Sequence, residues 1–204
     1  MLAVWTVTGT GWIDPLAARS LEMMWAGDTA IVATQYSYFP SWISFLVDKD
    51  EAAEEGRALN DAVFERWSRL PADDRPQLVS FGLSLGSYGS EAAFAEGTVE
   101  ASIAAVQTRT DGVLWMGPTH ANPVWNEVEG ARGTSPAWRP VIDDGEVLRF
   151  FARARPVDVD DWPAPRIVYV GHPSDPVTWW DVPTLWSQPA WQDEPVGYDV
   201  PPET

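Results

Sequence analysis

The chain has 204 residues, a net charge of -17 and no cysteine. This acidity disfavours nucleic acid and anionic membrane surfaces as direct partners, because both are polyanions that require basic patches. The lack of cysteine excludes disulfides, a thiolate nucleophile and cysteine-based zinc sites. No stretch has the roughly 18 to 20 apolar residues of a membrane span. We therefore expect a single soluble domain at residues 1–204.

Five short, β-rich apolar runs alternate with helical or loop segments along the chain. This alternation is typical of a parallel sheet built from βα units. The runs are residues 3–8, 29–35, 77–82, 112–117 and 166–171. The pattern predicts an α/β protein with a mostly parallel, doubly wound sheet and helices on both faces.

Two of the intervening segments have clear helix signals. Asp14 followed by Pro15 is typical of a helix cap and first turn, which predicts a helix over 14–27. Residues 50–74 carry apolar side chains at helical spacing, with acids early and arginines late. The segment 122–165 is rich in Pro, Gly and Trp, and we interpret it as a lid-like excursion before the last run.

The third run leads into the sequence GLSLGSYG, which contains the pentapeptide G-x-S-x-G centred on Ser84. A strand, this pentapeptide and then a small-residue helix form the setting of a nucleophile elbow. Gly82 and Gly86 are expected where neighbouring backbone passes too close for a side chain. The pattern predicts Ser84 as the nucleophile of a hydrolase, against the alternative of a plain glycine-rich turn.

An elbow of this type is accompanied by an oxyanion hole. The first run ends in TGTGWIDP, so a backbone N–H of Thr10 or Gly11 could join that of Leu85 in holding an oxyanion. The alternative is a tight strand-to-helix turn without a ligand.

The sequence offers a better candidate for the catalytic acid than for the catalytic base. Asp175 follows the last run, where an α/β sheet keeps its active site, and it can orient an imidazole; alternatively, it only caps the helix that begins at Pro176. The usual order places a histidine after the acid, yet residues 176–204 contain none. His172, three residues before Asp175 on the same loop, is the alternative base or lines the site. His120 also lies at the active-site edge, but chain order counts against it too.

These motifs resemble the catalytic domain of a bacterial, mainly actinobacterial, family of membrane-anchored α/β-hydrolases. The matching stretches are TGTGWIDP, AGDTAIVATQYSYFPSWISFLVD, GLSLGSYGSEAAF, RTDGVLWMGPTHANPVW and VYVGHPSDPVTWW. The resemblance implies the α/β-hydrolase fold, Ser84 as nucleophile and Asp175 as acid. It also implies membrane helices before this domain and a histidine-containing strand segment after it, so we expect this chain to be truncated at both ends, with its catalytic histidine beyond Thr204.

The function expected from these residues is that of a serine hydrolase acting on an ester or thioester through an acyl-enzyme. Acyl transfer to an alcohol would use the same parts, and a catalytically silent binding module is the alternative from another class. Aromatic residues near the loops favour an apolar, lipid-like acyl substrate, and membrane contact is expected only through segments outside this chain. A serine triad needs no cofactor, and the acids do not have metal-ligand spacing.

Overall fold

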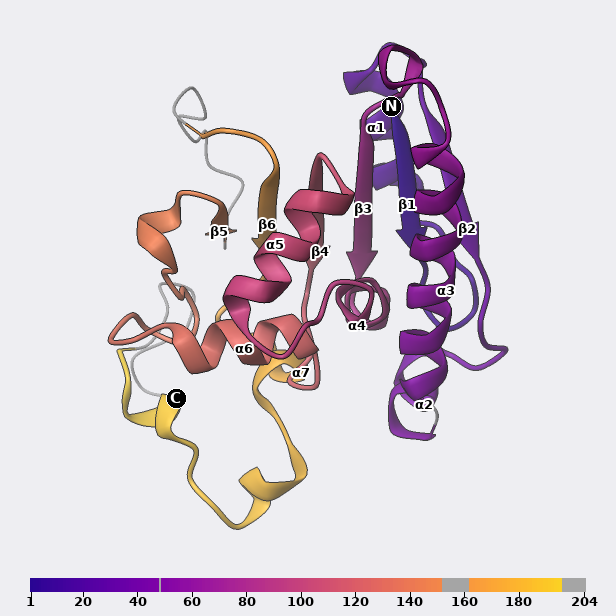
Figure 1. Ribbon diagram of the computed structural model, residues 1–204. Helices are drawn as coiled ribbons and strands as arrows, with labels where there is room; N and C mark the ends of the chain where they lie inside the picture. The colour runs from indigo at the N-terminus through magenta and orange to yellow at the C-terminus, as the bar shows by residue number, and fades with distance from the viewer. Residues whose placement is uncertain (48, 152–161, 196–204) are drawn as a thin grey trace.

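The computed structural model describes residues 1–47, 49–151 and 162–195 (Figure 1). Its centre is a six-stranded sheet in the order β2-β1-β3-β4-β6-β5, in which every pairing is parallel. The strands are β1 (Leu2–Thr6), β2 (Ala30–Thr34), β3 (Leu78–Leu83), β4 (Gly112–Met116), β5 (Leu148–Phe151) and β6 (Arg166–Val170).

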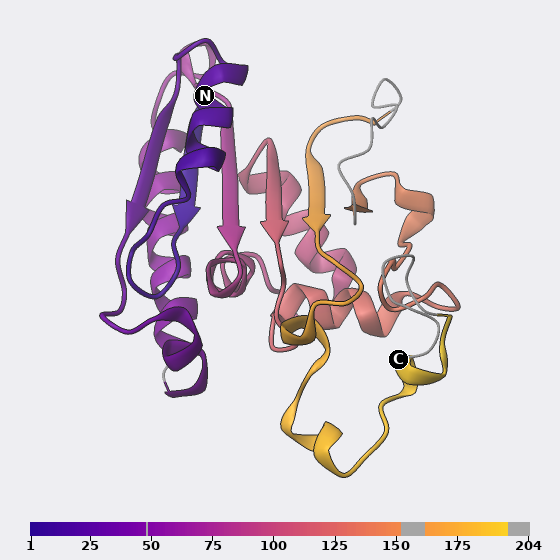
Figure 2. The same cartoon turned by 180° about the vertical axis from the view of Figure 1, so that it is seen from behind.

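Helices cover both faces of this sheet, as the sequence predicted. On one face lie α3 (Lys49–Ser68), α4 (Leu85–Ala92), α5 (Val99–Arg109) and α6 (Pro123–Ala131), and α1 (Pro15–Met24) lies on the other (Figures 1 and 2). Two short helices, α2 (Ser41–Val47) and α7 (Pro176–Trp179), lie beyond the ends of the strands. No helix among the described residues is long and apolar enough to cross a membrane.

All five predicted runs are strands, and the sixth strand, β5, lies inside the segment 122–165. β5 was missed because it is a four-residue edge strand whose sequence, LRFF, has no alternating pattern. The same segment contains α6, which begins at Pro123, and the 3₁₀ turn Asp143–Gly145. Regular structure is therefore present in part of this segment, and residues 152–161 lie outside the described residues.

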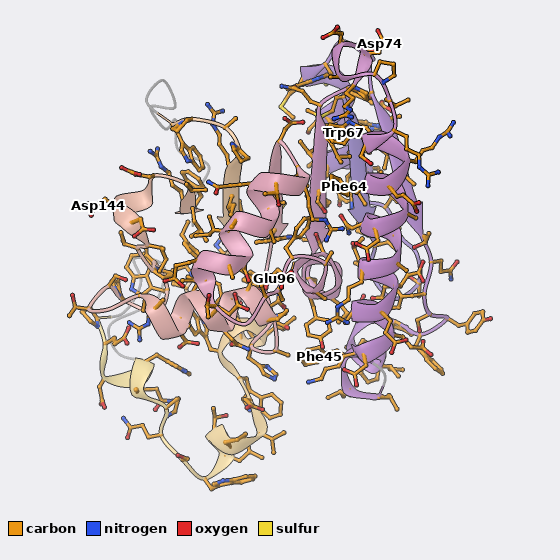
Figure 3. The ribbon with its side chains drawn as sticks, viewed as in Figure 1. Phe45, Phe64, Trp67, Asp74, Glu96 and Asp144 are labelled. Carbon is orange, nitrogen blue, oxygen red and sulfur yellow. The ribbon has the colours of Figure 1, made fainter. Side chains whose placement is uncertain are left out.

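The main core lies between β4, β6 and the helices α4, α5 and α6. Trp115 is fully buried at its centre, and its indole N–H donates to the Ser90 hydroxyl at 2.9 Å. On α3, Phe64 and Trp67 stack with their ring centroids 6.0 Å apart, and Figure 3 labels both on this helix. The hydrogen bond between Trp115 of β4 and Ser90 of α4 ties α4 to the middle of the sheet.

The carboxyl ends of all the strands meet at one edge of the sheet, the lower edge in Figure 1. The loops after β1, β3, β4 and β6 leave the sheet there, and α2 and α7 lie just below it. Figure 3 places Phe45 of α2 at this edge, below α4. Parallel α/β sheets bind their ligands at this edge. Ser84 lies there, between the end of β3 and the start of α4.

Candidate active site

Ser84 occupies the turn between β3 and α4 in a left-handed backbone conformation, with φ 54° and ψ -124°. A residue with a side chain adopts this conformation only at a cost of about 1 to 3 kcal/mol, so the surroundings must impose it. The N–H of Ser84 donates to the C=O of Met116 on β4 at 2.8 Å, and the N–H of Ser87 donates to the C=O of Ser84 at 2.8 Å. The turn is thus held from both sides.

The two glycines of the pentapeptide lie where backbone passes close by. A Cβ on Gly82 would lie 2.4 Å from the C=O oxygen of Gly86, and a Cβ on Gly86 would lie 2.3 Å from the C=O oxygen of Thr6. Both contacts are with backbone, which cannot rotate away. The first turn of α4 thus lies so close to β3 at Gly82 and to β1 at Gly86 that both positions require glycine, as the sequence predicted.

A buried hydrogen-bond network connects this turn to the loop after β4. The Ser87 hydroxyl donates to the C=O of Ser84 at 2.6 Å, and the Asn122 amide donates to the Ser87 hydroxyl at 2.9 Å and to Glu91 at 2.7 Å. The Asn122 oxygen in turn accepts from both the N–H and the hydroxyl of Thr119. The network fixes the loop 117–122 against α4.

Glu91 is the titratable member of this network and is fully buried. Its second oxygen accepts the N–H of Trp125 in the first turn of α6 at 2.9 Å. Burial raises the pKa of Glu91 to about 7, although the hydrogen bonds from Asn122 and Trp125 act in the opposite direction. Sequence reasoning missed this residue, yet a signal existed, since Glu91 is the only charged residue between Arg75 and Glu96.

Ser84 lines a cleft of about 610 Å³. One wall comes from α2, the opposite wall from α7, and the floor from Ser84, Leu85 and the loop after β4. The lining residues are Ser41, Trp42, Phe45, Leu46, Ser84, Leu85, Thr119, His120, Pro176, Val177 and Trp180. The sequence patterns predicted no helix at 41–47, although the apolar residues at 42, 45 and 46 have helical spacing.

His120 is the histidine that the structure places in this cleft. Its Nε2 lies 3.6 Å from a carboxylate oxygen of Asp181, and its ring meets Phe45 edge-on with centroids 5.3 Å apart. Its Nδ1 is buried and has no hydrogen-bond partner among the described residues. An imidazole with a carboxylate on one nitrogen and the other nitrogen unpaired has the parts of a general base.

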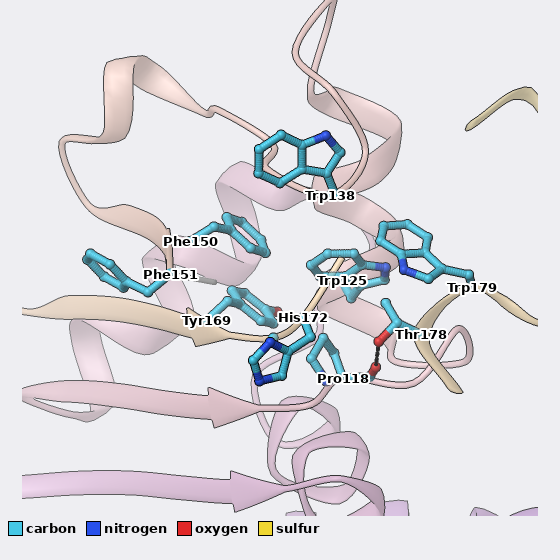
Figure 4. Close-up of a pocket in the computed structure, with 10 residues that line it drawn as sticks. Pro118, Trp125, Trp138, Phe150, Phe151, Tyr169, His172, Thr178 and Trp179 are labelled. Carbon is cyan, nitrogen blue, oxygen red and sulfur yellow. Dashed lines mark hydrogen bonds between the residues drawn. The ribbon is translucent and has the colours of Figure 1, made fainter. Parts of the chain in front are cut away.

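His172 lies elsewhere, at the rim of an aromatic pocket. Figure 4 shows its ring beside Pro118 and Tyr169, and Trp125 and Trp179 line the same pocket. Across this pocket the Thr178 hydroxyl donates to the C=O of Pro118. His172 is exposed and is not among the residues that line the Ser84 cleft.

Asp175 lies in the loop after β6, which ends at Val170, at the predicted edge of the sheet. One carboxylate oxygen accepts the N–H of Val177 at 3.0 Å and so caps α7, which follows with Pro176 in its first turn. The other oxygen lies 4.0 Å from where a Cβ on Gly117 would be, at the end of β4. Asp175 therefore has the capping role that the sequence offered as one alternative, and one oxygen faces the end of the neighbouring strand.

The three candidate oxyanion donors differ in their positions. Leu85 begins α4 and lines the cleft beside Ser84. The N–H of Gly11 donates to the C=O of Thr8 at 2.9 Å and is already paired, whereas Thr10 is exposed. Neither Thr10 nor Gly11 is among the residues that line the cleft.

The aromatic residues near the loops also divide into two groups. Trp180 lines the cleft, and Trp12 and Tyr38 are exposed. Trp125 is buried in the main core, with Trp179 packed against it at 6.0 Å between ring centroids. Only some of the aromatic residues near the loops are therefore available to a ligand.

A parallel sheet wound with helices on both faces, with a left-handed serine turn between its third strand and the next helix, has the architecture of an α/β-hydrolase. A model of an alpha/beta-hydrolase family matches residues 1–204. The chain belongs to this family.

Comparison with one solved structure supports the same fold, and two further structures match less well. An acetylxylan esterase structure at 0.90 Å resolution has a TM-score of 0.50 and 13% identity, covering 87% of this chain and 84% of that one. An iodinated acetyl xylan esterase complex has a TM-score of 0.49 and 14% identity over the same shares. Acylaminoacyl peptidase from Pyrococcus horikoshii has a TM-score of 0.41 and 10% identity over 84% of this chain and 32% of that one. No match was found among curated proteins.

Proposed function

We propose that the chain is a serine hydrolase that cleaves an ester or thioester with an apolar acyl group through an acyl-enzyme at Ser84. The observation that carries this proposal is the left-handed turn, which holds Ser84 between β3 and the N-terminus of α4 at the floor of a cleft. A strand, a strained serine turn and a following helix are the parts expected of a nucleophile elbow, which supports the proposal. The aromatic and aliphatic walls of the cleft favour an apolar acyl chain.

In the proposed reaction, the Ser84 hydroxyl attacks the carbonyl carbon and its proton passes to a histidine. The oxyanion is held by the N–H of Leu85 at the positive end of α4 and by an N–H from the loop after β1, for which Thr10 is the better candidate because that of Gly11 is paired. The leaving alcohol or thiol takes the proton from the histidine. Water then attacks the acyl-enzyme, releases the acid and restores Ser84.

The proposed acid is Asp175. The proposed base within this chain is His120, because it shares the cleft with Ser84 and faces Asp181. His172 is the weaker candidate, because it lines a different pocket. An alcohol could replace water as the acyl acceptor, which would make the protein an acyltransferase with the same residues.

Labelling with a fluorophosphonate probe tests the proposal. We expect the wild-type chain to be labelled and Ser84→Ala to lose labelling by at least about a thousandfold, because the attacking oxygen is gone. Ser20→Ala, an exposed serine on α1, is the matched control and should label normally. Loss of labelling in His120→Ala, but not in His172→Ala, would identify His120 as the base. A folded wild-type chain that stays unlabelled contradicts the proposal and favours a silent binding module.

A further inference from the structure

Two segments on opposite sides of the cleft expose large apolar side chains. The first, residues 38–47, exposes Tyr38 (92%), Trp42 (67%) and Leu46. It contains α2, and Trp42 and Leu46 also form one wall of the cleft. Large apolar side chains gathered at one place on a surface mark an interaction site, whereas single ones do not.

The second segment, residues 177–186, exposes Trp180, Leu185 and Trp186 (72%). It includes most of α7, which forms the opposite wall of the cleft, and the 3₁₀ turn Val182–Leu185. In Figure 1, both segments lie at the lower edge of the molecule, beyond the carboxyl ends of the strands. Together they form what we call the apolar collar, residues 38–47 and 177–186 around the mouth of the Ser84 cleft.

The apolar collar carries almost no charge. Residues 38–47 contain no charged side chain, and residues 177–186 contain only Asp181, which faces His120 at 3.6 Å. The collar has no lysine or arginine, and the whole chain carries a net charge of -17. An anionic surface would therefore be repelled, whereas an uncharged or zwitterionic surface would not.

The residue types and the position of the collar indicate what covers it. Tryptophan and tyrosine favour the boundary between water and lipid, because their rings are apolar while the indole N–H and phenol O–H stay hydrated. A protein covering the collar would also close the cleft. A lipid surface, in contrast, would cover the collar and present an ester directly to the cleft.

We propose that the apolar collar docks the protein on a bilayer surface of zwitterionic phospholipid, from which the Ser84 cleft takes a lipid-borne ester. Docking itself does not depend on the proposed function, whereas the choice of substrate rests on it. The proposal goes beyond the expectation that membrane contact is confined to segments outside this chain.

Vesicle binding by the Ser84→Ala chain tests docking separately from chemistry. We expect this chain to co-sediment with vesicles of pure phosphatidylcholine, and to bind less well as phosphatidylglycerol is added. Tyr38→Ser combined with Trp186→Ser removes one exposed ring from each segment without altering the cleft lining. This variant should lose at least tenfold in vesicle partitioning while retaining fluorophosphonate labelling when placed in the Ser84-containing chain.

The matched control changes two equally exposed apolar residues far from the collar, Leu16 and Met23 of α1, to serine. It should bind vesicles as the parent chain does. The proposal is overturned if the parent chain does not bind phosphatidylcholine vesicles, if both variants lose binding equally, or if phosphatidylglycerol strengthens binding. It is also overturned if the collar variant converts a dimer into a monomer in analytical ultracentrifugation, since the collar would then bind a second copy of the chain.

Discussion

Gly86→Ala is expected to destabilise the protein by at least about 3 kcal/mol, at the upper end of what overpacking costs. The added methyl carbon would lie 2.3 Å from the C=O oxygen of Thr6 and 3.1 Å from that of Val7. Both oxygens belong to the backbone at the end of β1, so relief requires α4 to move away from the sheet. Alanine is the better helix former by about 1 kcal/mol, which offsets only part of this cost.

Urea denaturation of the variant and of wild type measures this difference. Gly130→Ala is the matched control, because Gly130 also lies in a helix, α6, but a Cβ there has nothing within 4 Å. The control should be as stable as wild type or more stable by up to about 1 kcal/mol. If the unfolding free energy of Gly86→Ala is within 1 kcal/mol of that of wild type, the close approach of α4 to β1 is not as described. A folded Gly86→Ala chain should also label poorly, because the Ser84 turn moves with α4.

The second large effect concerns Glu91 and pH. The pKa of this carboxyl is raised from its ordinary value of 4.5 to about 7 in the folded chain, so between these values the folded state binds a proton that the unfolded state lacks. The contribution of Glu91 to stability is therefore fully present below pH 4.5, falls as pH rises, and is lost above pH 7. A shift of this size corresponds to about 3 kcal/mol.

Glu91→Gln removes the titration while keeping the shape of the side chain. The unfolding free energy of wild type minus that of Glu91→Gln should therefore fall by about 3 kcal/mol between pH 4.5 and pH 8. Urea denaturation at the two pH values measures it, and Glu96→Gln, an exposed neighbour, is the control and should show no such change. A wild-type minus Glu91→Gln difference that is the same at both pH values would mean that Glu91 does not hold its proton in the fold.

The sheet and the serine turn could be predicted because both depend on local sequence. The buried strands are short β-rich runs. The requirement for glycine at Gly82 and Gly86 follows from the backbone geometry of one pentapeptide. The same holds for Asp14, whose carboxylate accepts the N–H of Ala17 and caps α1 as expected.

The rest of the candidate site depends on contacts between distant segments. Nothing near His120 in the sequence indicates that it faces Asp181, which lies 61 residues later and reaches it only through the packing of α7 on the loop after β4. His172 was preferred to His120 because it lies on the same loop as Asp175, but the two histidines lie in different pockets after folding. Glu91 was likewise missed, because its partners Asn122 and Trp125 come from the loop after β4 and from α6.

The Ser84 turn and the walls of its cleft are built by separate parts of the chain. Ser84 is held by β3, β4 and α4, whereas the walls come from α2 and α7, two short helices outside the sheet. For the proposed hydrolase, changes in residues 41–47 or 176–180 would therefore alter which acyl groups enter without disturbing Ser84. With such a division, the walls of the cleft could be redesigned for a different ligand while the turn that holds Ser84 stays unchanged.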